Sequence, residues 1–329
     1  MALKIGPYDL GLGLILAPMA GVTDRPFRHL CRANGADYAV SEMISSKPEL
    51  WHTRKSLLGT DHRGEPTPIG VQIAGSEPDQ MAAAAEYVVS HGAQIVDINF
   101  GCPAKKVCRK AAGSALLEHP DLVEDIVRSV TTAVPAPVTI KIRLGPDLDN
   151  VNAVDIALRA QRAGAQAVAV HGRTRAEKFT GHARYEPIAW VKQALDIPVI
   201  ANGDITCPIK ARQVLEETGA DGLMLGRGAQ GNPWLFGEIR QFLETGKRSS
   251  GPDVAQVLEA MLVHLDGMEA LYGPSQGART FRKHIKWYLS RYAACEVLVQ
   301  VLLRTADTQE QRTHILDFLN LGIEAHKAA

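Results

Sequence analysis

The sequence predicts an α/β fold: a (β/α)8 or TIM barrel, which is a closed barrel of parallel strands alternating with helices, followed by a small C-terminal all-helical domain. Short runs of aliphatic and β-branched residues recur eight times, with helix-like segments between them. Strands that are apolar almost throughout indicate parallel pairing with both sheet faces covered. Eight such units in series are typical of the closed barrel, and the last quarter of the sequence has helical periodicity only.

The expected barrel strands are all short and mostly aliphatic. In chain order they cover residues 14–17, 38–41, 69–73, 95–99, 138–142, 167–171, 199–202 and 223–225. Helices are expected between them at residues 78–90, 121–134, 151–163 and 209–218. Asp121 is the expected N-cap of one helix, because its short carboxylate can accept from the first free N–H groups. Gly92, Gly164 and Gly219 are expected where helices end, because glycine adopts the left-handed conformation readily.

The pattern changes beyond the last expected strand and its helix. The stretch Gly-Lys-Arg-Ser-Ser-Gly-Pro is typical of a linker, and apolar residues such as Val257 and Met261 then recur at helical spacing. We therefore expect a barrel domain over residues 1–245, a linker over residues 246–252 and a helical domain over residues 253–329.

The composition excludes several classes of protein. Lys+Arg and Asp+Glu balance at 36 each, which excludes a globally basic nucleic-acid binder but is compatible with a local basic face. The five cysteines are scattered and odd in number, which indicates a reducing compartment and neither a disulfide framework nor a thiolate zinc site. No apolar run is long enough to span a bilayer. We expect a cytoplasmic monomer without a bound metal.

Polar residues occur where the expected strands end. Gln72, Asn99, Lys141, His171 and Asn202 all lie at or near the C-terminal end of a strand. In a (β/α)8 barrel that rim carries the active site. One such residue would decide little, because loop mouths are polar in any case, but five together predict a site.

Residues 226–231 match the dinucleotide-binding pattern G-x-G-x-x-G. They follow the last strand, however, and no further strand–helix–strand unit remains to complete a dinucleotide fold. In barrels, the loops after the seventh and eighth strands commonly bind phosphate through backbone N–H groups. The residues expected in those two loops are Asn202, Gly203, Asp204, Gly226 and Arg227. The pattern therefore predicts a mononucleotide ligand such as FMN, with a glycine turn that binds nothing as the alternative.

Cys102 lies in the segment Asn99-Phe100-Gly101-Cys102-Pro103, directly after the fourth expected strand. A lone cysteine is usually a buried small apolar residue. This one is expected at the barrel mouth, beside a basic loop with Lys105, Lys106, Arg109 and Lys110. A thiol with an ordinary pKa of about 8.5 is mostly protonated at neutral pH, so Cys102 is a candidate proton donor.

Together these motifs resemble the tRNA-dihydrouridine synthases, particularly the bacterial B type. The resemblance covers nearly the whole barrel, and the set of motifs is specific although each one alone is moderate evidence. The matching segments are Leu16-Ala17-Pro18-Met19-Ala20-Gly21-Val22-Thr23-Asp24, Ser41-Glu42-Met43, Val71-Gln72-Ile73, Asp97-Ile98-Asn99-Phe100-Gly101-Cys102-Pro103, Lys141-Ile142-Arg143, His171-Gly172-Arg173-Thr174-Arg175, Asn202-Gly203-Asp204 and Gly226-Arg227. Two positions depart from the family pattern: Phe100 stands where the B type commonly has Met, and Cys108 adds a second thiol outside the proton-donor motif.

The resemblance implies a specific chemistry. In that family FMN lies across the barrel mouth, NADPH reduces it, hydride passes to C6 of an everted uracil, and the motif cysteine protonates C5. By position, Cys102 is then the catalytic proton donor, and Asn99 and Arg143 hold the uracil. The implied flavin contacts are Pro18, Met19, Ala20, Gln72, Lys141 and His171, and the implied phosphate-side contacts are Asn202, Gly203, Asp204, Gly226 and Arg227.

A local basic stretch is the candidate RNA-binding surface. No carboxylate occurs between Ala270 and Cys295, and four cations recur there at three- and four-residue steps, as expected for one helix face. They are Arg279, Arg282, Lys283 and Lys286. A charge run alone is more often a solvated helix face, but the resemblance implies a helical domain that grips tRNA. The further candidates near the barrel mouth are Lys105, Lys106, Arg173 and Arg175.

Two other functions remain open at the level of sequence. A small-molecule FMN-dependent pyrimidine reductase, similar to dihydroorotate dehydrogenase, explains the flavin site and the thiol but not the basic helical appendage. A non-enzymatic RNA-binding or regulatory protein on a degenerate barrel explains the basic helix but not the full set of polar rim residues.

Overall fold

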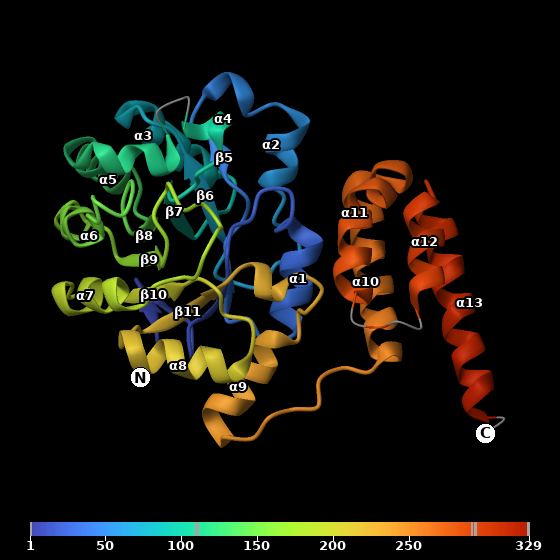
Figure 1. Cartoon of the computed structure of the whole chain (residues 1–329). Helices are drawn as coiled ribbons and strands as arrows, with labels where there is room; N and C mark the ends of the chain where they lie inside the picture. Colours follow the sequence, from blue (N-terminus) through green and yellow to red (C-terminus); the bar gives the residue numbers. More distant parts are fainter. Residues whose placement is uncertain (1, 109–111, 291, 293–294, 328–329) are drawn as a thin grey trace.

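The computed structural model describes the chain (Figure 1) over residues 2–108, 112–290, 292 and 295–327. The side chains of Lys105, Lys106 and residues 321–327 lie outside this description.

The core is a closed barrel of parallel strands, which confirms the predicted (β/α)8 fold. The strands are β3 (Leu14–Leu16), β4 (Tyr38–Ala39), β5 (Ile44–Ser45), β6 (Gly70–Ala74), β7 (Ile95–Phe100), β8 (Val138–Arg143), β9 (Ala167–His171), β10 (Val199–Asn202) and β11 (Gly222–Leu225). They are hydrogen-bonded in the order β4-β3-β11-β10-β9-β8-β7-β6-β5. A parallel bridge between Val40 and Gly70 closes the ring, so β4 and β5 are two pieces of a single barrel strand.

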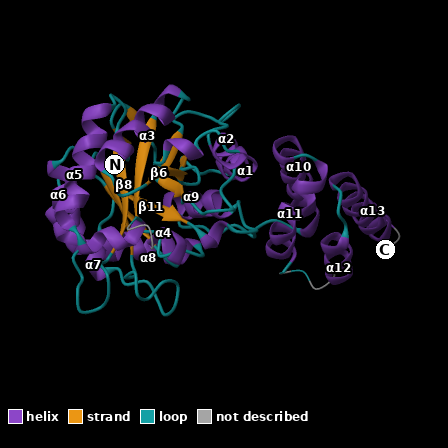
Figure 2. Ribbon diagram, turned by 90° about the horizontal axis from the view of Figure 1, so that it is seen from above, coloured by secondary structure: helices purple, strands orange, loops and turns teal. Residues whose placement is uncertain are grey.

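Helices surround the barrel, as Figure 2 shows from above. They are α1 (Arg25–Ala33), α2 (Arg54–Gly59), α3 (Pro78–Ser90), α4 (Lys105–Cys108), α5 (Pro120–Ala133), α6 (Ala153–Arg162), α7 (Glu186–Ala194), α8 (Pro208–Thr218) and α9 (Leu235–Thr245). The prediction that Asp121 is an N-cap was wrong, because α5 begins at Pro120 after His119. Asp121 instead lies in the first turn, where the helix dipole favours its charge.

A short hairpin covers the N-terminal end of the barrel. Its strands, β1 (Lys4–Ile5) and β2 (Tyr8–Asp9), pair antiparallel and have no counterpart in the sequence-based prediction. Ile5 is buried in one cluster with Ile15 and Ile200 of the barrel interior. This end is therefore filled by apolar side chains, and the opposite rim is left for polar residues.

The C-terminal helices form a second layer beside the barrel. They are α10 (Val254–Tyr272), α11 (Pro274–Leu289), α12 (Glu296–Arg304) and α13 (Thr308–Lys327). They have an apolar core of their own, which includes Val257, Met261 and Phe281. No helix in the described part of the chain combines the length and apolar character needed to cross a membrane.

The two layers meet where α1 packs against α10 (Figure 1), and the Phe27 ring of α1 also contacts His284 of α11. Leu30 of α1 belongs to the apolar core of the C-terminal helices, and the Phe27 ring stacks on His264 at 5.7 Å between centroids. Gly267 allows this close approach, because a Cβ at that position would lie 2.8 Å from Cβ of Pro26.

Polar contacts at the same junction reach the loop that follows β3. The Tyr272 hydroxyl donates to Asp24 Oδ2 at 3.0 Å, and the Lys283 ammonium donates to the Gly21 carbonyl. The Gly21 N–H donates in turn to Glu42 Oε2 at 2.7 Å. The helical layer is therefore tied directly to the loop that carries Pro18, Met19 and Ala20.

Candidate active site

The C-terminal rim of the barrel encloses a cavity of about 1050 Å³. Every residue that the sequence suggested as proton donor, flavin contact, phosphate contact or uracil contact lines this one space. These residues are Pro18, Met19, Ala20, Gln72, Asn99, Cys102, Lys141, Arg143, His171, Asn202, Gly203, Asp204, Gly226 and Arg227. They come from seven different strand ends, and the parallel barrel brings them to the same edge.

Cys102 is half-buried at the wall of the cavity. Its N–H donates to Asn99 Oδ1 at 2.9 Å, and its carbonyl accepts from both Ser114 N at 3.1 Å and Ser114 Oγ at 2.9 Å. Burial raises the pKa of the Cys102 thiol above its ordinary value. The thiol therefore keeps its proton at neutral pH, as a proton donor must.

Cys108 is not part of the cavity wall. Its Sγ lies 3.5 Å from the Cys102 carbonyl and 3.8 Å from Ser114 Oγ, behind the loop. The second thiol therefore supports the Cys102 backbone and leaves Cys102 as the thiol that lines the cavity.

Lys141 and His171 meet at the amide of Asn202. Asn202 Nδ2 donates to the Met224 carbonyl at 2.6 Å, which leaves Oδ1 to accept from Lys141 Nζ at 3.0 Å and from His171 Nδ1 at 2.8 Å. This arrangement fixes the Nδ1–H tautomer of His171.

The charges around this amide are well defined. Burial, reinforced by Lys141 and Arg143, lowers the pKa of His171 to about 2, so the imidazole is neutral. Burial also lowers the pKa of Lys141 to about 8, so in most molecules its amine is still protonated and cationic at pH 7. The cavity therefore has a cation and a neutral imidazole side by side.

The loops after β10 and β11 form a cationic corner. Asp204 accepts from Arg173 at 2.6 Å and from Arg227 at 3.3 Å, which ties the two loops together. Gly203 and Asp204 both have positive φ, at 131° and 50°. The corner therefore places two guanidiniums and one carboxylate beside a turn with positive-φ backbone.

Arg143 braces the loop that carries Cys102. Its guanidinium donates to Gly101 O at 2.8 Å, to Thr174 O at 2.9 Å and to Lys178 O at 2.7 Å. Burial lowers the pKa of Arg143 to about 10, so it remains charged at neutral pH. Its cation therefore lies in the same wall as Cys102.

Several cavity residues were not expected from the sequence. Phe179 is 55% exposed and lies between two guanidiniums, 5.3 Å from Arg143 Cζ and 5.2 Å from Arg227 Cζ. Met43 and His182 also line the space. All three lie outside the strands and helices, so strand and helix periodicity gives no indication of where they point.

The candidate RNA contacts near the mouth divide into three cases. Arg173 was expected to contact RNA, but it is 1% exposed and donates to Asp204, Thr180 O and Gly181 O. Arg173 therefore holds the Asp204 loop in position by hydrogen bonds and does not reach the surface. Arg175 pairs with Glu118 at 2.7 Å, and the side chains of Lys105 and Lys106 lie outside the description.

The four cations of α11 do not form one open face. Arg279 and Lys286 are exposed, whereas Arg282 donates to the Thr305 carbonyl at 3.2 Å. Lys283 faces the barrel and donates to Gly21 O. Two of the four residues are therefore open to a ligand in solution, and two tie the helices in place.

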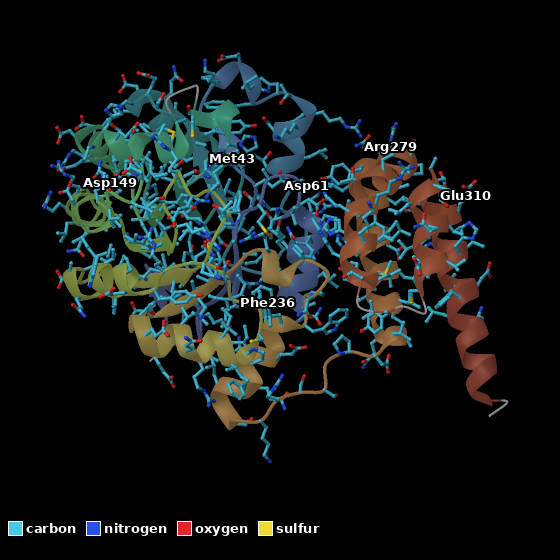
Figure 3. All side chains as sticks on the ribbon, in the orientation of Figure 1. Met43, Asp61, Asp149, Phe236, Arg279 and Glu310 are labelled. Atoms are coloured by element: carbon cyan, nitrogen blue, oxygen red, sulfur yellow. The ribbon has the colours of Figure 1, made fainter. Side chains whose placement is uncertain are left out.

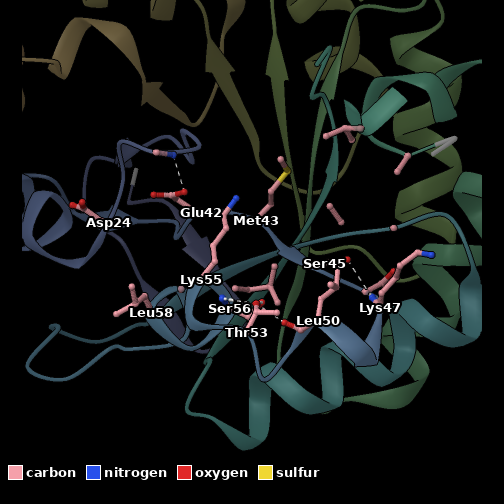
Figure 4. Close-up of a pocket in the computed structure, with 18 of the residues that line it drawn as sticks. Asp24, Glu42, Met43, Ser45, Lys47, Leu50, Thr53, Lys55, Ser56 and Leu58 are labelled. Atoms are coloured by element: carbon pink, nitrogen blue, oxygen red, sulfur yellow. Dashed lines mark hydrogen bonds between the residues drawn. The ribbon is translucent and has the colours of Figure 1, made fainter. Parts of the chain in front are cut away.

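A second cavity of about 1140 Å³ lies between the barrel and the C-terminal helices. Figure 4 shows its lining residues on the barrel side, among them Glu42, Met43 and Lys55. Lys47, Lys55 and Ser56 line it from the barrel, and Tyr272 and Lys283 line it from α10 and α11. Met43 borders both this cavity and the rim cavity, so the two spaces adjoin. Figure 3 places Met43 on the barrel and Arg279 on α11 across from it.

Comparison with known proteins gives the family. The family model described as Dihydrouridine synthase (Dus) matches residues 15–324. The chain belongs to the dihydrouridine synthase family. It is 52% identical over 98% of its length to tRNA-dihydrouridine synthase B of Pseudomonas syringae pv. tomato, of which 95% is covered. It is 57% identical over 87% of its length to the protein of that name from Xanthomonas axonopodis pv. citri, of which 86% is covered.

Solved structures support the barrel fold of this dihydrouridine synthase. Histamine dehydrogenase from Rhizobium sp. 4-9 matches with a TM-score of 0.58 and 11% identity, over 80% of this chain and 50% of that one. Morphinone reductase in complex with tetrahydroNAD matches with a TM-score of 0.53 and 15% identity, over 78% of this chain and 93% of that one. At these identities the likeness shows the fold alone.

A flavin, which this family of oxidoreductases uses, fits the residues of the rim cavity. The buried ammonium of Lys141 has a neighbouring neutral imidazole, and the corner at Asp204, Gly226 and Arg227 combines cations with positive-φ backbone. The floor is apolar, with Ala17 and Met224 among its residues. A flat ring system with an anionic tail matches this division between an apolar floor and a cationic corner.

Proposed function

We propose that this protein is a tRNA-dihydrouridine synthase of the B type. It would reduce the C5–C6 double bond of specific uridines in tRNA, with FMN as cofactor and NADPH as reductant. The observation that carries the proposal is the protonated Cys102 thiol, which lines the same rim cavity as a cationic corner suited to a phosphate. Membership of the family and the names of relatives at 52% and 57% identity support it.

The roles of the rim residues follow from their places in the cavity. Bound FMN supplies the hydride that is added to C6 of the uracil. The Cys102 thiol gives its proton to C5, so that one hydride and one proton saturate the double bond. The resulting thiolate is half-exposed, and water can return its proton before the next turnover.

Lys141 and Arg143 stabilise the charge that develops during this step. Addition of hydride to C6 leaves enolate-like negative charge on the pyrimidine until C5 is protonated, and preorganised cations lower the energy of such a state. Both side chains line the cavity, and their pKa values of about 8 and about 10 keep them charged at neutral pH.

Asp204, Gly226 and Arg227 would hold the phosphate of FMN at the cationic corner. Pro18, Met19 and Ala20 would contact its ring system. Gln72 and His171 would fix the position of the ring by hydrogen bonds. The hydrogen bond from Lys283 to the Gly21 carbonyl fixes the loop that carries Pro18 and Met19 against the helical layer.

The RNA lies across the rim and the helical layer. Arg279 and Lys286 are exposed on α11, and Lys47 and Lys55 line the second cavity between the layers. Phosphates would bind to these cations, while one uridine is everted into the rim cavity at a cost of a few kcal/mol. The enzyme acts in the cytoplasm, as a monomer.

The test is a reaction of the purified protein with NADPH and a tRNA transcript that carries no modification. Mass spectrometry should show the gain of two hydrogens at defined uridines, and the protein should be yellow. Free uridine and orotate are offered in parallel. Turnover of a free pyrimidine but not of tRNA would favour the small-molecule reductase, and a colourless protein that binds tRNA would favour the non-enzymatic alternative.

A further inference from the structure

Four buried polar side chains form a continuous hydrogen-bonded chain behind the rim cavity. Thr139 Oγ1 donates to Asp97 Oδ1 at 2.7 Å, and Gln72 Nε2 donates to Asp97 Oδ2 at 2.7 Å. Asn99 Nδ2 donates to Gln72 Oε1 at 2.7 Å. Asn99 Oδ1 then accepts from Cys102 N at 2.9 Å and from Gly101 N at 3.2 Å. All four side chains are buried, with exposures of 1–7%.

The direction of this chain is set at Asp97. A carboxylate can only accept, so Gln72 must turn its NH₂ group toward Asp97 and its oxygen toward Asn99. Asn99 must then turn its own NH₂ toward Gln72, which leaves its oxygen facing the backbone N–H groups of the Cys102 loop. The Asp97 end and the Cys102-loop end therefore require the same amide orientations, because a carboxylate can only accept and the backbone N–H groups can only donate.

We propose that Asp97 is a positioning residue, which fixes the amide orientations of Gln72 and Asn99 and thereby what the cavity offers its ligands. The inference rests on the proposed function, since it concerns the binding of flavin and uracil in that cavity. Asp97 does not line the cavity and acts through Gln72 and Asn99, which do.

The fixed polarity has a chemical consequence. Asn99 Oδ1 is occupied by two N–H donors, so Asn99 can offer a ligand only its second N–H, which lies beside the weak acceptor Met43 Sδ at 3.9 Å. Gln72 likewise has one N–H to spare. These two amides are therefore donors, matched to pyrimidine carbonyl oxygens or acceptor ring nitrogens and opposed to an amino group at the same place.

Reversing the direction of these side-chain hydrogen bonds would conflict with the backbone N–H groups of the Cys102 loop. If Gln72 turned over, Asn99 would have to present its NH₂ to the N–H groups of Gly101 and Cys102, and buried donors would face each other. Such unsatisfied groups are costly in a buried site. The conformation of the catalytic loop and the polarity of the amides are thus coupled through one carboxylate.

The first variant is Asp97→Asn, which keeps the shape but removes the charge that sets the polarity. We expect flavin to remain bound, the KM for tRNA to stay within about threefold and kcat to fall roughly 10- to 100-fold, as for a misplaced substrate-holding group. Thr139→Val is the matched variant, because it removes a donor to the same carboxylate without altering the polarity. It should lower the melting temperature while turnover per bound flavin falls less than in Asp97→Asn.

The decisive variant is the exchange Asp97→Asn/Asn99→Asp. With Gln72 reversed, the carboxylate moved to position 99 can accept from Gly101 N, Cys102 N and Gln72. The amide moved to position 97 donates to Gln72 and accepts from Thr139. Every hydrogen bond is then satisfied again, so the exchange should recover the melting temperature that the single variants lose. Turnover should stay low, because position 99 then faces the cavity as an acceptor.

Each outcome decides the proposal. Unchanged kcat in Asp97→Asn, an equal loss in Thr139→Val, or an exchange variant no more stable than the single ones would overturn it. So would recovery of turnover together with stability, because polarity would then be irrelevant to the ligand. If Asp97→Asn alone does not fold, recovery of folded protein in the exchange variant supports the chain and its absence overturns it. A wild-type protein that forms no dihydrouridine would instead remove the proposed function.

Discussion

Cys102 and Cys108 share one loop, yet only the first lines the rim cavity, while the second bonds to the Cys102 carbonyl from behind. Cys102→Ala should reduce dihydrouridine formation by roughly 10²- to 10⁴-fold and leave flavin bound, the usual range for loss of a general acid. Cys108→Ala is the control, with an effect below about threefold. Single-turnover formation of dihydrouridine by the reduced protein measures both, and equal losses would assign Cys102 a structural part only.

Asp97 and Lys141 should set the two limits of the pH profile. Burial raises the pKa of Asp97 to about 6, and the charge of Lys141 on β8 opposes this shift. The Asp97 carboxylate in turn contributes to the raised pKa of Tyr38 on β4. Turnover should fall below about pH 6, as the carboxyl is protonated, and above about pH 8, as Lys141 loses its charge. Asp97→Asn should remove the acidic limb only, and its persistence in that variant would contradict the assignment.

The contribution of Asp97 to the stability of the fold changes with pH in the opposite direction to turnover. A carboxyl whose pKa is raised by folding from 3.8 to about 6 stabilises the fold most below pH 3.8, and this contribution is lost as the pH rises through 6. Asp24, whose pKa burial also raises to about 6, has the same sign. The acidic limb of the pH profile therefore reflects the chemistry of the site, because neither group lowers the melting temperature between pH 6 and pH 5.

Arg227 pairs with Asp204 at the exposed side of the cationic corner, with its side chain 51% accessible. Arg227→Ala should release FMN, seen as lower flavin absorbance per protein after dialysis and recovery when FMN is added. Arg63→Ala, an exposed arginine paired with Asp61 outside the rim cavity, is the control. Full flavin occupancy of the Arg227 variant at submicromolar FMN would exclude a phosphate contact.

At the scale of elements, the barrel strands were predictable because each is a short apolar run with both faces covered. The expected range 199–202 is identical to β10, and 167–171 is identical to β9. The second barrel strand was harder to predict, because residues 40–43 separate its two pieces, β4 and β5. Within that stretch, Glu42 and Met43 line the second cavity. The β1–β2 hairpin was missed because two-residue strands have no detectable period.

The polar residues at or near the ends of the expected strands were predictable from the sequence, whereas Asp97 and Thr139 were not. Asp97 and Thr139 stand inside β7 and β8, and sequence alone gives no sign that they bond to each other across the register. Arg173 was expected to contact RNA because it follows β9 at the rim. Its burial depends on Asp204, which arrives from another loop, so only the folded structure reveals it.

The crossing of α1 and α10 depends on a missing side chain. Gly267→Val should push α10 away from Pro26, since even a Cβ would come within 2.8 Å, and should lower stability by about 1–3 kcal/mol. Val263→Ala, on the exposed side of the same helix, should change stability by less than about 0.5 kcal/mol. Urea unfolding compares the two, and equal values would mean that the helices adjust without cost.

For the whole molecule, a net charge of zero makes RNA affinity depend on where cations are exposed. Arg279 and Lys286 are exposed on α11, so Lys286→Ala should weaken tRNA binding and reduce the salt slope by about 0.7–0.9 for each phosphate that is no longer neutralised. Arg128→Ala, a cation paired with Glu124 on α5, is the control. An unchanged slope for Lys286→Ala would place the RNA elsewhere.

The β1–β2 hairpin covers the end of the barrel that lies opposite the rim cavity. Ile5 and its neighbours fill that end, so under the proposed function the reductant and the uridine would both reach the cavity from the rim. If the two substrates occupy the same place in turn, the electrons would stay with the flavin between the two binding events. Such a reaction would show ping-pong kinetics.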